Sequence, residues 1–93
     1  MTSKQRAYLK SLASVLEPVL SLGKETLTPE FTEAVRETFN TRELIKINVL
    51  KTCDLDINEI AIEISRVTHS ELVQKIGRTL VFYKKAKEPK III

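Results

Sequence analysis

The chain has 93 residues, of which 43% are hydrophobic and 29% are charged, with only two glycines and three prolines. This length allows a single domain spanning residues 1–93, and the composition excludes a disordered or fibrous protein. The net charge of +3 is a modest excess of cations, which is compatible with a polyanionic partner such as a nucleic acid.

The first predicted element is a helix over residues 2–17. Thr2 and Gln5 have the spacing of a capping box, and Pro18 follows the segment as its terminator. The apolar residues recur at the three- and four-residue spacing of one helical face: Leu9, Leu12, Ala13 and Leu16. The opposite face of this helix is therefore expected to be polar and basic.

A short strand is predicted at residues 19–22, and a second helix begins at Pro29. Thr28 favours this start because its hydroxyl can cap the first turn, where proline is also well tolerated. The helical pattern ends near residue 40. Apolar and polar residues then alternate over residues 45–49, which predicts a second strand.

Residues 57–68 fit two patterns, because their apolar residues match both a strand and one face of a helix. Asp56 and Glu59 have the spacing of a capping box, and strands of twelve residues are uncommon. We therefore interpret this segment as a helix.

A hairpin is predicted at the end of the domain, with strands at 72–76 and 79–84. Gly77 comes first in the two-residue loop between them, as a type II′ turn requires. The resulting order α-β-α-β-α-β-β predicts an α/β fold with a small mixed four-stranded sheet and helices packed on it. Right-handed crossovers make the first three strands parallel, and the hairpin adds an antiparallel fourth. Residues 84–93 form a basic and apolar tail.

Catalysis is not expected, because the chain has one histidine and one cysteine and no phosphate-loop or dinucleotide motif. His69 is interpreted as a loop or cap residue, Cys53 as a small buried apolar residue, and Asp54 and Asp56 as solvated or capping groups. We predict a non-enzymatic protein without a metal or other cofactor. The polar N-terminus and short apolar runs predict a cytoplasmic protein that does not contact a membrane.

Charge is segregated along the chain. Residues 1–24 have a net charge of +3 and residues 75–93 a net charge of +5, whereas residues 25–74 have a net charge of −5. If the two ends meet in the fold, they form a cationic surface for phosphates. The alternative is a solvated surface with a frayed lysine-rich tail.

The turn Gly23-Lys24-Glu25-Thr26 leads into a predicted helix N-terminus. Unpaired N–H groups and the positive end of the helix dipole can receive a phosphate there, beside Lys24. The same residues also fit an ordinary strand-to-helix connection in which glycine adopts a strained dihedral.

Four sequence blocks occur in order along the chain: TxKQRxYLKSLA at 2–13, PV and LGK within 18–24, ELIKI at 43–47 and IGRTLVFYK at 76–84. In order and spacing they resemble the YhbY-like family of CRM-domain RNA-binding proteins. The resemblance implies a fold similar to the C-terminal domain of bacterial translation initiation factor three. For stand-alone bacterial members, it also implies association with precursors of the large ribosomal subunit.

The resemblance is incomplete in the turn before the second helix. In the family this turn usually reads Gly-Lys-Gly-Gly, a GxxG loop whose backbone approaches RNA closely. Gly23 and Lys24 match, but Glu25 and Thr26 replace the last two glycines. Glu25 would repel a phosphate at close range unless it points away or pairs with a lysine, whereas Thr26 can donate a hydroxyl hydrogen bond.

The leading interpretation is a monomeric RNA-binding protein that assists assembly of the large ribosomal subunit and contacts folded rRNA through phosphates. The predicted RNA-binding residues form one surface if both termini fold onto a common side: Arg6, Lys10, Gly23, Lys24, Thr26, Arg78, Lys84, Lys85 and Lys87. One alternative is a protein-interaction module that uses the basic ends and the Ile91–Ile93 edge. Another is a small DNA-binding α/β protein.

Overall fold

The computed structural model describes residues 1–24 and 27–93 and has the predicted order of elements. Three helices and four strands are present: α1 (Ser3–Ala13), β1 (Leu20–Leu22), α2 (Pro29–Phe39), β2 (Leu44–Val49), α3 (Ile57–Thr68), β3 (Glu71–Ile76) and β4 (Thr79–Tyr83). The predicted fold class, a mixed sheet with helices packed on it, is therefore confirmed.

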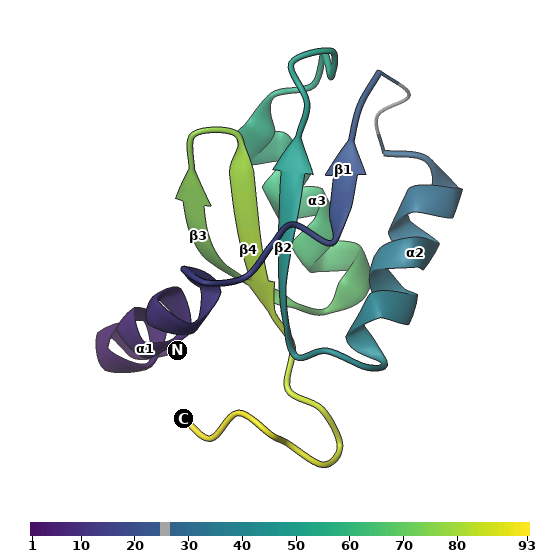
Figure 1. The fold of residues 1–93 in the computed structure, drawn as a ribbon. Coiled ribbons are helices and arrows are strands. Elements are labelled where there is room, and N and C mark those ends of the chain that lie inside the picture. The colour runs from purple at the N-terminus through teal and green to yellow at the C-terminus, as the bar shows by residue number, and fades with distance from the viewer. Residues whose placement is uncertain (25–26) are drawn as a thin grey trace.

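The four strands form one sheet in the order β1-β2-β4-β3. β1 pairs with β2 in parallel, and β4 pairs antiparallel with both β2 and β3. The first three strands therefore point the same way, as predicted, and β4 runs against them (Figure 1). The antiparallel strand lies inside the sheet, between β2 and β3, a position that the order of elements alone does not determine.

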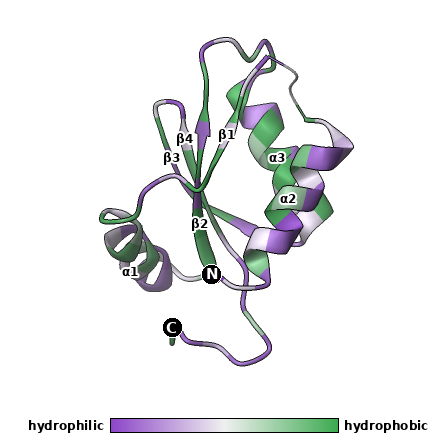
Figure 2. Cartoon of the chain, turned by 45° about the vertical axis from the view of Figure 1, so that its right-hand side comes forward, coloured by the Kyte–Doolittle hydropathy of each residue, from purple (hydrophilic) through white to green (hydrophobic). Residues whose placement is uncertain are grey.

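Helices cover both faces of the sheet. α2 and α3 lie on one face and α1 on the other (Figure 2), and apolar residues of all three helices join the cores against the strands. Successive side chains of β2 face opposite sides of the sheet, so this strand contributes to the core on each face. Ile45 and Ile47 join the core beneath α2 and α3, while Leu44 joins the smaller core beneath α1. In the same way, β4 sends Phe82 to the first core and Val81 to the second.

The bounds of α2 and α3 follow their capping residues. Thr28 accepts a hydrogen bond from the backbone of Phe31, and Asp56 accepts bonds from the backbones of Asn58 and Glu59. Each side chain satisfies donors that a helix start leaves unpaired, which explains why these two starts were predicted correctly.

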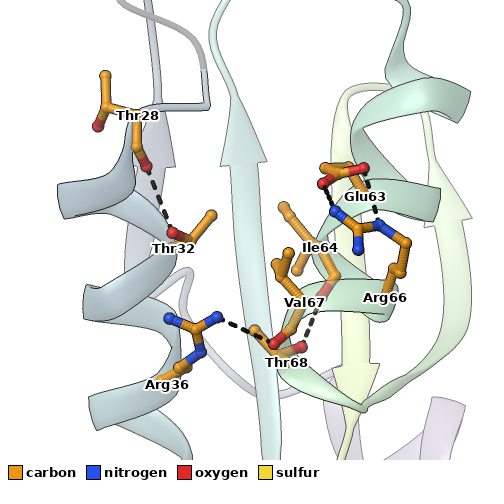
Figure 3. Close-up of polar contacts among 8 residues, drawn as sticks. All are labelled: Thr28, Thr32, Arg36, Glu63, Ile64, Arg66, Val67 and Thr68. Atoms are coloured by element: carbon orange, nitrogen blue, oxygen red, sulfur yellow. Dashed lines mark hydrogen bonds and ion pairs between the residues drawn. The ribbon is translucent and has the colours of Figure 1, made fainter.

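A polar contact joins α2 to α3 on the outer face of the molecule, and further ones lie within each helix (Figure 3). Arg36 of α2 donates to the Val67 carbonyl, 3.2 Å away, and also pairs with Glu33. Arg66 pairs with Glu63 within α3. These two arginines neutralise acids of the middle segment, so this face offers few unpaired cations.

The first helix is shorter than predicted and ends at Ala13 instead of residue 17. Ser11 and Ser14 donate their hydroxyls to backbone carbonyls three residues earlier, which competes with regular helical bonding near this end. The chain then turns toward the sheet, and the Leu16 carbonyl accepts a hydrogen bond from Lys46 of β2 at 3.1 Å. Pro18 is therefore not what ends the helix.

The two glycines have different backbone conformations. Gly77 has φ +56° at the tip of the β3–β4 hairpin, while Arg78 is not in the left-handed region, in agreement with the predicted type II′ turn. Gly23 does not have a positive φ. The strained glycine considered for the Gly23 turn is therefore not observed.

Candidate nucleic-acid interface

The carboxyl ends of β1 and β2 and the tip of the β3–β4 hairpin lie together at one end of the sheet (Figure 1). The Leu50 backbone N–H donates to the Leu22 carbonyl at 2.8 Å, which joins the ends of the two parallel strands. Arg78 donates from Nε to the Val49 carbonyl and from Nη2 to the Leu50 carbonyl, both at 2.9 Å. We call this region the loop end and define it by Gly23, Lys24, Lys51 and Arg78.

The loop end presents cations beside a glycine that the fold itself does not require. Lys24, Lys51 and Arg78 are all exposed. A Cβ atom at Gly23 would lie 3.4 Å from Leu50 Cδ1 and 3.6 Å from the hydroxyl oxygen of Thr52, which are ordinary contacts. Neither backbone strain nor crowding therefore explains this glycine. The predicted contact Thr26, with Glu25, lies outside the described residues.

A second cationic region lies at the opposite end of β4, where the tail leaves the sheet and passes α1. The tail and the C-terminal part of α1 border a groove with an apolar floor that includes Leu12 and Leu16. Cationic side chains surround this groove, and we call them the tail end: Arg42, Lys84, Lys85, Lys87 and Lys90. The exposed position of most of these side chains suits contact with phosphates.

The predicted single surface is wrong in one respect, because Arg78 and the tail lysines lie at opposite ends of β4. The six residue steps from Arg78 to Lys84 span about 20 Å at a strand rise of roughly 3.3 Å per residue. The prediction that the termini come together does hold for α1 and the tail, since Ile91 packs against the α1 core with Leu12 and Leu16. The molecule therefore has two separate cationic ends.

Arg6 has a structural role that its sequence position does not reveal. Its Nη1 donates to the Leu72 carbonyl at 2.7 Å and to the Val73 carbonyl at 2.9 Å. Val73 is the extra residue of a β-bulge, because Leu72 and Gln74 pair with consecutive residues of β4. Arg6 thus ties α1 to the irregular part of an edge strand. Lys10, one turn further along the same flank, is exposed.

Glu43, in the connection between α2 and β2, is the acidic residue at the centre of the tail end. Only 7% of its surface is exposed, and Oε1 accepts hydrogen bonds from the backbones of Lys90 and Ile91. Burial by itself would raise the pKa of Glu43. The N–H groups of Lys90, Ile91 and Ala86 and the Lys90 charge outweigh it and lower that pKa below its ordinary value. The carboxylate is therefore ionised at neutral pH.

Oε2 of Glu43 has no hydrogen-bond partner within residues 1–24 and 27–93. In the same ranges, no three histidine, cysteine, aspartate or glutamate side chains cluster as metal ligands would. None of the three described helices is both long and apolar enough to span a bilayer.

Comparison with known proteins assigns the family. The model of the CRS1/YhbY (CRM) domain matches residues 1–84. The chain belongs to the CRS1/YhbY (CRM) domain family. It is 39% identical over 92 residues to the "Probable RNA-binding protein YqeI" of Bacillus subtilis, covering 99% of this chain and 96% of that protein. It is 38% identical over 95 aligned positions to an "RNA-binding protein" of Haemophilus influenzae, covering 98% and 92% of the two chains.

The fold of this CRM domain also matches a solved structure. The solution structure of the hypothetical protein SAV1595 from Staphylococcus aureus, described as a putative RNA binding protein, superimposes with a TM-score of 0.82. The two chains are 40% identical, and the match covers 97% of this chain and 94% of the other. The resemblance stated from four sequence blocks is therefore confirmed over nearly the whole domain.

Four residues of the two ends are not among the predicted RNA-binding residues: Lys51, Arg42, Glu43 and Lys90. Lys51 lies two residues after the end of β2 and could have been placed beside Gly23, because the carboxyl ends of parallel strands lie at the same edge of a sheet. Arg42 and Glu43 precede β2, and no local pattern indicates that the tail folds back onto them. Their proximity to the tail is visible only in the folded chain.

Substitution R6A is expected to lower the free energy of unfolding by about 1–2 kcal/mol, because it removes charged donors from two partly buried carbonyls. Urea denaturation measures this change. The matched control is K10A, on the same flank of α1 but exposed, which should change stability by less than about 0.5 kcal/mol. Equal stabilities of R6A and K10A would contradict the structural role of Arg6.

Proposed function

We propose that this CRM domain is a non-enzymatic, monomeric RNA-binding protein of the cytoplasm that assists assembly of the large ribosomal subunit. It contacts folded rRNA mainly through phosphates, at the loop end and the tail end. The length of β4 separates the two ends by about 20 Å. They therefore contact phosphates that the folding of the RNA brings near each other.

The observation that carries this proposal is the unbalanced charge of the tail end. Five cations surround the groove there, whereas its acids are Glu43, which is buried and bound to backbone N–H groups, and the exposed Glu88. Arg36, the sixth cation of the groove, is paired with Glu33. Phosphate contacts of this kind supply most of the sequence-independent affinity of a protein for nucleic acid.

The loop end supports the same function through its backbone. Gly23 is not required by the dihedral angles or the space of this chain, so its lack of a side chain suits the close approach of a partner. In KH domains a GxxG loop clamps the nucleic-acid backbone in this way. Lys24 and Lys51, both exposed, add positive charge at the same end of the sheet.

The finer assignment, to precursors of the large ribosomal subunit, rests on the resemblance of the four sequence blocks to stand-alone bacterial YhbY-like proteins. The names of the relatives support RNA as the class of ligand.

The affinity of the wild-type protein for an rRNA fragment should fall with salt. About six phosphate contacts give a slope of log affinity against log salt near −4, at roughly −0.7 per contact. K85A/K87A should reduce this slope to about −2.8, which corresponds to four remaining contacts, because both exposed lysines belong to the tail end. R66A, which removes a cation already paired with Glu63 on the outer face of α3, should leave the slope unchanged. A salt-independent affinity, or no retention on rRNA at low salt, excludes the proposed phosphate contacts.

Substitution G23A separates RNA binding from folding. The free energy of unfolding should change by less than about 0.5 kcal/mol, because the new methyl group meets only ordinary contacts and φ is not positive. RNA affinity should fall several-fold, since the methyl group stands where a phosphate backbone approaches. Fluorescence anisotropy and thermal unfolding measure the two effects. An affinity equal to that of the wild type would show that RNA does not approach Gly23.

Sedimentation of a cell extract tests the role in ribosome assembly. The protein should migrate with immature large subunits in a sucrose gradient and separate from them when salt is raised. Migration only with free RNA or only with the small subunit would contradict the assembly role. RNA binding itself is tested separately, by the salt titration.

A further inference from the structure

We propose that Glu43 is a positioning residue for RNA binding, because its buried carboxylate closes the tail into a loop that presents lysines to phosphates. The inference rests on the proposed function and deepens it. It assigns to an acidic side chain a favourable effect on the binding of a polyanion.

Glu43 holds both ends of the segment from residue 84 to residue 91. Its backbone carbonyl accepts a hydrogen bond from the Lys84 N–H at 2.8 Å, directly after β4. Its side-chain Oε1 accepts bonds from the Lys90 and Ile91 N–H groups, the second at 3.0 Å. One residue therefore brings together two points of the chain that are seven residues apart, as in compact surface loops.

An apolar contact supports the same closure. Ile91 is partly buried and packs on the α1 core with Leu12 and Leu16, whereas its neighbour Ile92 is 84% exposed. Residues 84–93 contain no strand, so the Ile91–Ile93 segment does not extend an edge of the chain's own sheet. The closed loop is instead fixed to α1 on one side and to Glu43 on the other.

The closed loop concentrates positive charge. It contains four lysines and one acid, Glu88. In an open tail these lysines would lose much conformational freedom on binding, and closing the loop in advance reduces that cost. Glu43 belongs to the ELIKI block, while the family model ends at Lys84. The contact therefore joins a residue of the matched domain to a segment beyond the match.

Simple electrostatics predicts the opposite change in the affinity for RNA when Glu43 is replaced by a neutral residue. Removing a negative charge roughly 10 Å from a phosphate in water would raise the affinity for RNA about twofold. Loss of the loop should instead lower the affinity, because the lysines are no longer held together. The direction of the change thus distinguishes the two accounts.

The test compares the affinities of four variants for a large-subunit rRNA fragment at one low salt concentration, using fluorescence anisotropy. E43A, which lacks an acceptor for the tail, should bind 3- to 10-fold more weakly than the wild type. E43Q, whose amide oxygen can still accept from the tail, should lie between them. I91S should weaken binding although every charge is kept, and I92S, the matched control, should bind as the wild type does.

A triple lysine variant shows whether Glu43 acts through the tail. In a K85A/K87A/K90A background, E43A should cause no further loss of affinity, and E43A alone should make the tail lysines more accessible to trypsin. If the wild type binds RNA and E43A binds equally or more tightly, the inference is overturned while the proposed function stands. If the wild type does not bind RNA, the proposed function fails first. I91S keeps the test valid if E43A does not fold, and an I91S affinity equal to that of the wild type also overturns the inference.

Discussion

β4 runs antiparallel to the other three strands, and this reversal determines where the cations of the C-terminal segment lie. The hairpin turns at the end of the sheet where β1 and β2 finish, so Arg78 is fixed beside the Val49 and Leu50 carbonyls. β4 then returns the chain to the opposite end, where Lys84 bonds to Glu43 and the tail meets α1. Charge that is continuous in the sequence is thereby divided between two surfaces about 20 Å apart.

The cations of this CRM domain fall into two groups by what they contact. Arg6, Arg36 and Lys46 donate to backbone carbonyls and fasten α1, α2 and the α1–β1 connection to the rest of the fold. Lys24 and Lys51 at the loop end are exposed, as are most tail lysines. A count of positive residues therefore overestimates the surface offered to RNA. Arg78 belongs to both groups, because its guanidinium bonds two carbonyls and is still exposed.

Local signals were sufficient for most of the fold. α2 and α3 begin where Thr28 and Asp56 cap them, and the hairpin turns where Gly77 allows a positive φ. The end of α1 was misplaced because serine side chains compete with the helix there, while the apolar pattern continues to Leu16. Apolar spacing alone does not reveal that competition.

The candidate site was less predictable, because it depends on contacts between distant parts of the chain. The order of strands within the sheet places Arg78 away from the tail, and that order is not encoded in the order of elements. The bulge that engages Arg6 is 66 residues away in the sequence. The same holds for Glu43 and Ile91, which are 48 residues apart. Family resemblance identified the domain correctly but did not indicate which of its cations the fold itself uses.

The account is tested most directly by titrating ¹⁵N-labelled protein with an rRNA fragment and mapping the backbone amides whose NMR signals shift. Shifts should concentrate at the loop end and in residues 84–91, with little change on the outer face of α2 and α3. Shifts confined to the α2–α3 face, or none in the tail at saturating RNA, would contradict the assignment of RNA contacts to the two ends of β4.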